Sequence, residues 1–185
     1  MSVVEPEVNP CIYVVHSDGT GLKRLTDDPG WEGSPSWSPD GNRIVCVSQI
    51  GAHPWYDAGT VRVMNADGSQ KEKLTKGAAR GSSPTWSPDG KRIAIHDNDE
   101  DRIVVVPAHG GGTPVALLDP VSDFATDDIT AMPAWTPDGK ALAGASNGGD
   151  ESPHGSRLYI VNGDGSGRSA VRGVDDAMGP AWRPR

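Results

Sequence analysis

A short segment built around tryptophan, proline, aspartate and glycine recurs along this chain, and it restricts the possible fold more than any other feature. The segment spans residues 34–41, returns at 83–90 and 132–139, and begins again at 179. Its tryptophans stand 49, 49 and 47 residues apart, at Trp37, Trp86, Trp135 and Trp182. A second motif, an apolar run that leads into Asp-Gly, alternates with the first. A period in the forties with strand–turn–strand content is typical of β-propeller blades.

We therefore predict an all-β chain that folds as a single β-propeller domain of four-stranded antiparallel blades over residues 1–185. Strand a ends at the tryptophan, strand b follows Pro-Asp-Gly, strand c precedes the second Asp-Gly turn, and strand d follows it. Proline and glycine suit the backbone angles of the first turn, and the aspartates are expected to bond nearby amides. The repeated tryptophans and aspartates are thus expected to be structural. The predicted blades are blade 1, split between 1–26 and 179–185, blade 2 over 34–75, blade 3 over 83–118, and blade 4 over 132–172.

The split blade predicts how the propeller closes. Blade 1 would take strand a from 179–183, strand b from 2–5, and strands c and d from 11–26. Strand pairing between both ends of the chain would then close a four-bladed ring and remove its exposed edges. Two alternatives stay open: a head-to-tail homodimer with eight blades, and a longer propeller of which these residues are an excerpt.

Charge and composition narrow the class of partner. The formal net charge of −8 and the isoelectric point near 5.0 argue against nucleic acid and against anionic lipid. No apolar run reaches the roughly 18 residues of a membrane span. The first residues lack a signal peptide, which predicts a cytoplasmic protein, or a periplasmic or secreted one if a leader was removed. Cys11 and Cys46 fall in apolar runs and are expected to be buried thiols rather than a disulfide.

The paired motifs Ser-Pro-Ser-Trp-Ser-Pro-Asp-Gly-Asn-Arg-Ile (34–44) and Val-Met-Asn-Ala-Asp-Gly (63–68) resemble the TolB-type, WD-like β-propeller repeat. The resemblance covers nearly the whole chain and implies the propeller fold. It also implies a role in protein interaction, because the family's best-known members bind partners in the cell envelope. Similar repeats form the gating propeller of prolyl-oligopeptidase-like peptidases, but the sequence has no Gly-x-Ser-x-Gly nucleophile motif.

The predicted strand order divides the loops between two faces. The a–b and c–d turns share one face, and the d–a and b–c loops share the other. More than half of the 25 acidic residues fall in the second set, so this face is expected to be acidic and to attract cations or basic partners. Its loops also differ most between repeats, which is typical of binding surfaces on repeat scaffolds.

We predict a non-enzymatic propeller that presents this face to a protein or small ligand, without a cofactor. Trp31 lies outside the repeat, and the long loop near residue 55 carries three aromatic or imidazole side chains. The predicted binding residues are Trp31, Glu32, His53, Trp55, Tyr56, Arg80, Asp127 and Asp128.

Two further predictions concern metals. Asp97, Asp99 and Asp101 place carboxylates at alternate positions, as at the start of a calcium loop, although the remainder of an EF-hand is missing. A loose Ca²⁺ site is therefore one expectation. The alternative function is a small metal-assisted lyase or hydrolase, in which His53, His96 and His154 would meet over the central channel.

Overall fold

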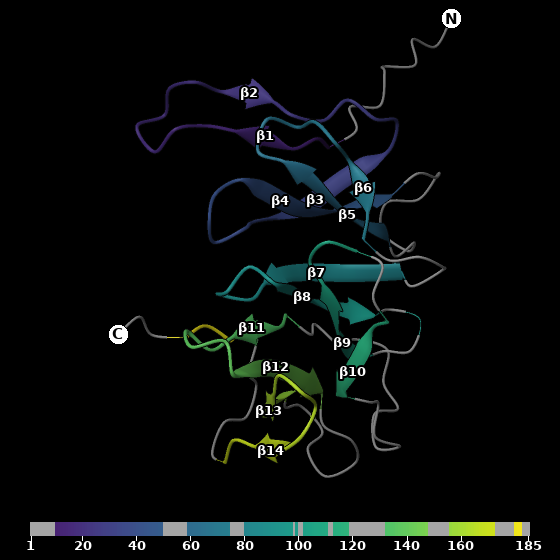
Figure 1. Ribbon diagram of the computed structural model, residues 1–185, viewed down its shortest axis with the longest axis vertical. Coiled ribbons are helices and arrows are strands. Elements are labelled where there is room, and N and C mark those ends of the chain that lie inside the picture. Colours follow the sequence, from purple (N-terminus) through teal and green to yellow (C-terminus); the bar gives the residue numbers. More distant parts are fainter. Residues whose placement is uncertain are drawn as a thin grey trace, which may run out of the picture.

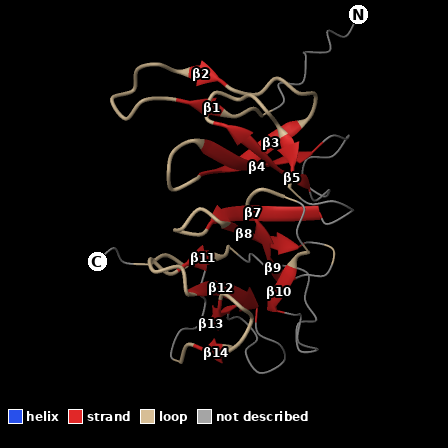
Figure 2. Ribbon diagram, in the orientation of Figure 1, coloured by secondary structure: helices blue, strands red, loops and turns tan. Residues whose placement is uncertain are grey.

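The computed structural model describes residues 10–49, 59–74, 80–97, 99, 102–110, 113–118, 132–147, 156–172 and 180–182. All regular structure among these residues is β, as Figure 2 shows. In chain order the strands are β1 (Tyr13–Val14), β2 (Lys23–Arg24), β3 (Trp31–Trp37), β4 (Arg43–Gln49), β5 (Gly59–Asn65), β6 (Glu72–Lys73), β7 (Arg80–Trp86), β8 (Arg92–Asp97), β9 (Arg102–Pro107), β10 (Val115–Leu118), β11 (Ala134–Trp135), β12 (Ala141–Asn147), β13 (Ser156–Asn162) and β14 (Ser169–Ala170). The all-β prediction is confirmed.

The strands form successive antiparallel blades. β3–β6, β7–β10 and β11–β14 each pair in sequence order, and the hairpin β1–β2 precedes them. Figure 1 shows the blades stacked one after another along the long axis of the molecule. One further pairing, between β5 and β7 at Gly59 and Gly81, joins two neighbouring blades into one sheet. The described sheets do not join into a closed ring.

The Pro-Asp-Gly turns between strands a and b are held by their own side chains. Ser38 donates to Asp40 Oδ1 over 2.5 Å, and the same carboxylate accepts the backbone N–H of Asn42. Ser87–Asp89 and Thr136–Asp138 repeat this arrangement. These bonds lower the pKa of Asp40 to about 2, with the Ser38 hydroxyl as the largest cause. The expected structural role of the repeated aspartates is confirmed.

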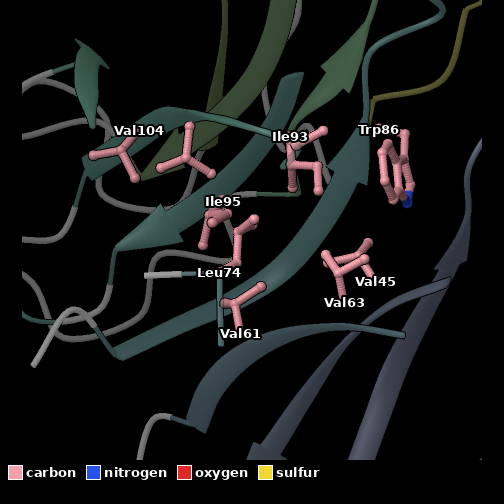
Figure 3. Packing of buried hydrophobic residues seen from close by; sticks show 10 residues of the cluster. Val45, Val61, Val63, Leu74, Trp86, Ile93, Ile95 and Val104 are labelled. Carbon is pink, nitrogen blue, oxygen red and sulfur yellow. The ribbon is translucent and has the colours of Figure 1, made fainter. Parts of the chain in front are cut away.

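Apolar strands b and c form the core because both of their faces are covered. In β4 and β8 every residue between the first and the last is buried. One cluster, drawn in Figure 3, lies between the second and third blades and includes Val45, Val61, Trp86, Ile93 and Ile95. The Trp86 ring lies at one edge of this cluster, so this motif tryptophan packs between blades, as the sequence predicts.

We call the side of each blade junction that lies at strands c and d its outer half. The same glycine contact occurs there in each junction. The c–d turn glycine of one blade lies on strand d of the preceding blade, near a buried leucine. Gly68 meets Leu25, Gly110 lies near the carbonyl of Leu74, and Gly165 lies near Leu117. A Cβ on Gly68 would lie 2.6 Å from the Leu25 carbonyl oxygen, and Gly68 has a φ of 90°. Only glycine combines this close approach with the left-handed backbone.

The inner half of each junction lies at strand a. There the motif tryptophans form a series of hydrogen bonds from blade to blade. The indole N–H of Trp86 donates to the Ser36 carbonyl over 3.1 Å, and that of Trp135 donates to Thr85 over 3.3 Å. The N–H of Trp182 donates to Ala134 over 3.0 Å. Each acceptor directly precedes the tryptophan of the preceding blade. We call this series the tryptophan ladder.

Two arginines reinforce the ladder. The Arg43 guanidinium lies 4.8 Å from the Trp86 ring centroid, and that of Arg92 lies 4.6 Å from the ring centroid of Trp135. Arg43 also donates to the Ala108 carbonyl, and Arg92 donates to carbonyls of the following blade. Each arginine therefore joins its own blade to the next by a cation–π contact and a hydrogen bond.

Two other sequence predictions concern the cysteines and membrane association. Neither Cys11 nor Cys46 forms a disulfide, as predicted, but only Cys46 is buried, whereas Cys11 is partly exposed. Within the same part, no helix has the length and apolar character needed to cross a bilayer.

Candidate binding face

Buried polar side chains concentrate at one end of the blades. We call this end, where strand a begins and strand b ends, the loop face. Two buried polar residues, Ser38 and Ser87, belong to the opposite turns and are explained by their turn bonds. Glu32, Ser48, His96 and Asp97 are buried at the loop face. Three of these four are ionisable. The polar groups whose burial costs the most free energy therefore lie at the loop face.

Strand register divides these residues between different layers. Ile44 and Cys46 of β4 pack toward the hairpin β1–β2, whereas Val45 packs toward the third blade. Glu32 pairs with Ser48 across the strands, so both side chains face the hairpin side. By the same alternation His96 faces the fourth blade and Asp97 faces the second. The predicted site residues share one end of the molecule but not one pocket.

Glu32 and Ser48 form a buried pair with spare hydrogen-bonding capacity. Glu32 is 4% exposed and Ser48 is 3% exposed. Within the described part of the chain, Glu32 Oε2 and Ser48 Oγ are buried and have no hydrogen-bond partner. A buried acceptor without a donor costs free energy of about 1–3 kcal/mol, so each such group calls for an explanation, and one explanation is a bound donor.

Asp28 connects the hairpin to the second blade through two cations. Its Oδ2 lies 3.0 Å from Lys71 Nζ and 3.5 Å from Arg62 Nη1. The hydrogen bond from Lys71 is the main reason that the pKa of Asp28 is lowered. Burial disfavours the charged form of Lys71, but its attraction to Asp28 prevails and raises the pKa of the ammonium group. The three carboxylates Asp27, Asp28 and Glu32 thus face two cations. The negative charge of the loop face is therefore more fully balanced here than the sequence suggests.

Cys46 lies in the same layer and is chemically quiet. Burial, followed by the negative charge of Glu32, raises the pKa of the Cys46 thiol to about 12. A thiol with this pKa stays protonated at neutral pH and is a poor nucleophile or metal ligand. We therefore assign Cys46 to the core.

In the third blade, Asp97 is already engaged by protein groups. It is 6% exposed, its Oδ2 lies 3.4 Å from Arg102 Nε, and its Oδ1 accepts the backbone N–H of Asp99. Asp99 is exposed, and Asp101 lies outside the described residues. The Ca²⁺ prediction for these three aspartates therefore stays a prediction, and the geometry of Asp97 gives it no support.

His96 is the predicted histidine that the structure describes. It is 6% exposed, and its Nδ1 lies 3.3 Å from Ser82 Oγ of the adjacent strand. Among the described residues, no three His, Cys, Asp or Glu side chains come together as a metal ion requires. His96 alone therefore supports no metal site.

Trp31 and Arg80 begin equivalent strands of two blades. The sequence places Trp31 outside the repeat, whereas the structure makes it the first residue of β3, paired with Gln49. Its ring covers Gly33, where a Cβ would collide with the indole. Arg80 begins β7 and pairs with Thr60 of β5. Trp31 is half-buried, so part of its ring still faces solvent at the loop face.

The remaining predicted residues, His53, Trp55, Tyr56, Asp127, Asp128 and His154, lie outside the described residues. The structure adds three residues that the sequence did not single out. Ser48 directly follows the apolar run Val45–Val47. A buried polar residue in an otherwise apolar strand is the sequence signal that could have identified it. Arg62 and Lys71 give no such signal, because only the stacking of blades brings them to Asp28.

Comparison with solved structures identifies the same fold in proteins of different activity. TolB from Acinetobacter baumannii superposes with a TM-score of 0.73 at 20% identity, over 98% of this chain and 42% of that one. An oligogalacturonate lyase in complex with manganese gives 0.60 at 21% identity, over 84% and 42%. A chain of a nidogen/laminin complex gives 0.65 at 14% identity, over 89% and 57%. The chain spans about half the length of these structures, and such identities show the fold alone.

Sequence comparison gives one match of another kind. The profile described as TolB beta propeller domain matches residues 1–185. No curated protein matches the sequence.

Proposed function

Because the chain belongs to the TolB beta propeller domain family, we propose that it is a binding propeller that presents its loop face to a protein or small ligand. The described residues bring no three metal-ligating side chains together at this face. They do place a buried carboxylate there with an unused acceptor. This combination supports recognition more than bond making or breaking.

The observation that carries the proposal is the unpaired Glu32 Oε2, next to the unpaired Ser48 Oγ. A ligand that brings an N–H or O–H donor would satisfy both groups and recover the cost of their burial. Around Glu32, the carboxylates Asp27, Asp28 and Glu32 outnumber the cations Arg62 and Lys71, and in the next blade Asp97 pairs with Arg102. The preferred ligand group is therefore a cation, such as a lysine or arginine side chain of a partner.

The half-exposed Trp31 ring supports the same proposal. An aromatic ring beside carboxylates can hold the aliphatic stem and the cationic head of such a side chain. Trp31 directly precedes Glu32, but the two side chains face opposite sides of β3. A ligand that contacts both would have to cross the end of the strand at the loop face.

A peptide-binding measurement tests the proposal. The probes are fluorescent hexalysine and hexaglutamate peptides, and the readout is fluorescence anisotropy at low salt. We expect the hexalysine peptide to bind and the hexaglutamate peptide not to bind. Glu32→Gln keeps the shape of the side chain but removes its charge, and should weaken hexalysine binding by about fivefold or more.

The matched control is Asp67→Asn, which removes one charge from a c–d turn on the opposite face and should leave hexalysine binding unchanged. If Glu32→Gln and Asp67→Asn weaken binding equally, the attraction is only that of net charge. If neither peptide binds, the proposed cation preference is wrong. Circular dichroism of both variants shows that the fold is retained.

The alternative of a metal-assisted lyase or hydrolase stays a prediction that depends on His53 and His154, which lie outside the described residues. The manganese of the lyase structure belongs to that protein. In the described part of this chain, His96 is buried against Ser82, and no three His, Cys, Asp or Glu side chains come together as a metal ion requires.

A further inference from the structure

Among the described residues, the second blade lacks on one side the cover that its successors have. Trp37, Trp86 and Trp135 occupy equivalent positions in three blades, yet Trp37 is 48% exposed, against 5% for Trp86 and 7% for Trp135. The Trp37 indole has no hydrogen-bond acceptor among the described residues. All four motif tryptophans are described, and the other three each donate to a carbonyl in the tryptophan ladder.

Neighbouring positions of the repeat show the same difference. Pro35 is exposed, whereas its equivalents Pro84 and Pro133 are buried. The turn glycine Gly41 has open space around it, while Gly90 lies on Pro39 and Gly139 lies on Pro88 of the preceding blade. Pro35, Trp37 and Gly41 thus form an uncovered surface, which we call the open edge.

The hairpin β1–β2 covers only the outer part of this side. Ile12 and Leu25 pack on Ile44, Cys46 and Met64, and Gly68 makes the usual glycine contact with Leu25. The outer half of the first junction is therefore complete. Its inner half needs a strand a, with a carbonyl placed to accept from Trp37.

The other end of the ladder holds the matching group. Residues 180–182 lie beside β11, where Trp182 donates to the Ala134 carbonyl (Figure 1). Each ladder acceptor is the residue before a motif tryptophan, so the next acceptor in the series is the carbonyl of Ala181. Ala181 is exposed. Among the described residues, a donor without an acceptor at one end of the stack therefore corresponds to an acceptor without a donor at the other.

We propose that the open edge binds residues 180–182 of a second copy of this chain, with Trp37 donating to the Ala181 carbonyl of that copy. The contact is head-to-tail, because the open edge and residues 180–182 are different surfaces. Two copies related by a twofold axis satisfy both Trp37 donors and both Ala181 acceptors. This inference does not depend on the proposed function, because the open edge lies at the turn end of β3 and the loop face lies at its other end.

The first test is the mass of the purified 185-residue chain by size-exclusion chromatography with light scattering, over a dilution series. We expect a dimer that dissociates on dilution. Trp37→Ala should raise the dissociation constant by about tenfold or more, because it removes a buried aromatic anchor. Trp37→Phe keeps the apolar ring without the N–H and should give a smaller increase.

Val115→Ala is the matched control, since Val115 is 49% exposed and lies on β10, away from the ladder. It should leave the dissociation constant unchanged. Because Trp37 is already exposed in the single chain, Trp37→Ala should fold, which near-ultraviolet circular dichroism checks.

A mixing experiment tests the head-to-tail geometry. Trp37→Ala damages only the open edge, and Trp182→Ala damages only the segment 180–182. Each variant alone should dimerise poorly, whereas an equimolar mixture regains one intact contact per dimer and should associate more tightly than either. A symmetric contact of Trp37 with Trp37 would show no such recovery and would overturn the proposal.

Two other results would also overturn the proposal. One is a monomer at all concentrations in which iodide fails to quench Trp37, shown by comparison with Trp37→Phe, because the ring would then close within one chain. The other is a monomer in which iodide quenches Trp37, because the open edge would then have no occupant from this chain.

Discussion

The junction between the second and third blades and the junction between the hairpin β1–β2 and the second blade differ in one half only. Both have the outer contact, in which a turn glycine lies on strand d of the preceding blade. The junction of the second and third blades adds the inner contact, with Trp86 buried beneath Arg43 and bonded to Ser36. In the first junction Trp37 remains exposed. The same repeat residue is therefore core in one blade and surface in another, depending only on its neighbour.

The strongest test of this difference compares Trp86→Ala with Trp37→Ala in the monomer. Trp86→Ala should lower the free energy of unfolding by about 3–5 kcal/mol, because it leaves a cavity and removes the Arg43 and Ser36 contacts. Trp37→Ala should cost less than about 1 kcal/mol, because the side chain is half exposed. Urea denaturation at protein concentrations below dimer formation measures both values. Equal losses would show that Trp37 is covered within the single chain.

A second test addresses the outer contact that the two junctions share. Gly68→Ala places a Cβ against the Leu25 carbonyl and forces alanine to a φ of 90°, so it should cost about 2–3 kcal/mol. Gly19 has a similar φ of 83° with open space around it. Gly19→Ala should therefore cost only about 1 kcal/mol, the backbone part. Thermal unfolding compares the two, and equal costs would mean that the hairpin does not lie on the Gly68 turn.

The smallest effect concerns the ion pairs that cross the first junction. Because the folded-state pKa of Asp28 is lowered, its contribution to stability is present above the unfolded pKa of about 4 and is lost as pH falls toward the folded pKa. Asp28→Asn should cost about 0.5–1 kcal/mol at pH 6, as expected for a partly exposed pair, and less as pH falls below 4.

Asp27→Asn is the control for this prediction. The Asp27 side chain is 89% exposed and lies 3.8 Å from Lys71 Nζ, so its replacement should change stability very little. Urea denaturation at several pH values gives both curves. A cost for Asp28→Asn that is independent of pH would show that packing, rather than the ion pair, is lost.

Much of the fold could be predicted from the sequence because its causes are local. Proline, aspartate and glycine specify the a–b turn within four residues, and the apolar runs after them specify strands covered on both faces. The sequence-based prediction was wrong at Trp31, which the repeat pattern placed in a loop outside the strands. Its backbone pairs with Gln49 in the adjacent strand, and this extension of β3 depends on the partner strand rather than on the identity of Trp31.

The candidate site was predicted at the level of a face and not at the level of its contacts. Because strand direction alternates within a blade, the sequence predicts that Glu32, His96 and Asp97 lie at the loop face. It does not show that Arg62 and Lys71 approach Asp28, nor that Arg102 approaches Asp97. Arg62 and Lys71 lie far from Asp28 in the sequence, so their distances to it depend on the tertiary structure. Arg102 lies opposite Asp97 on the paired strand of the same blade, and its contact depends on the register of that pair.

The sequence by itself determined the repeat, the turn chemistry and the antiparallel β-blades, because a four-residue turn and an alternating strand carry their own physical instructions. The tertiary structure alone decided which copies of a repeated residue are buried. Trp37 and Trp86 stand in the same sequence motif, yet among the described residues only Trp86 has a strand a in front of it to accept its N–H and an arginine to cover its ring. Burial is a property of the junction, and a junction exists only where two blades meet.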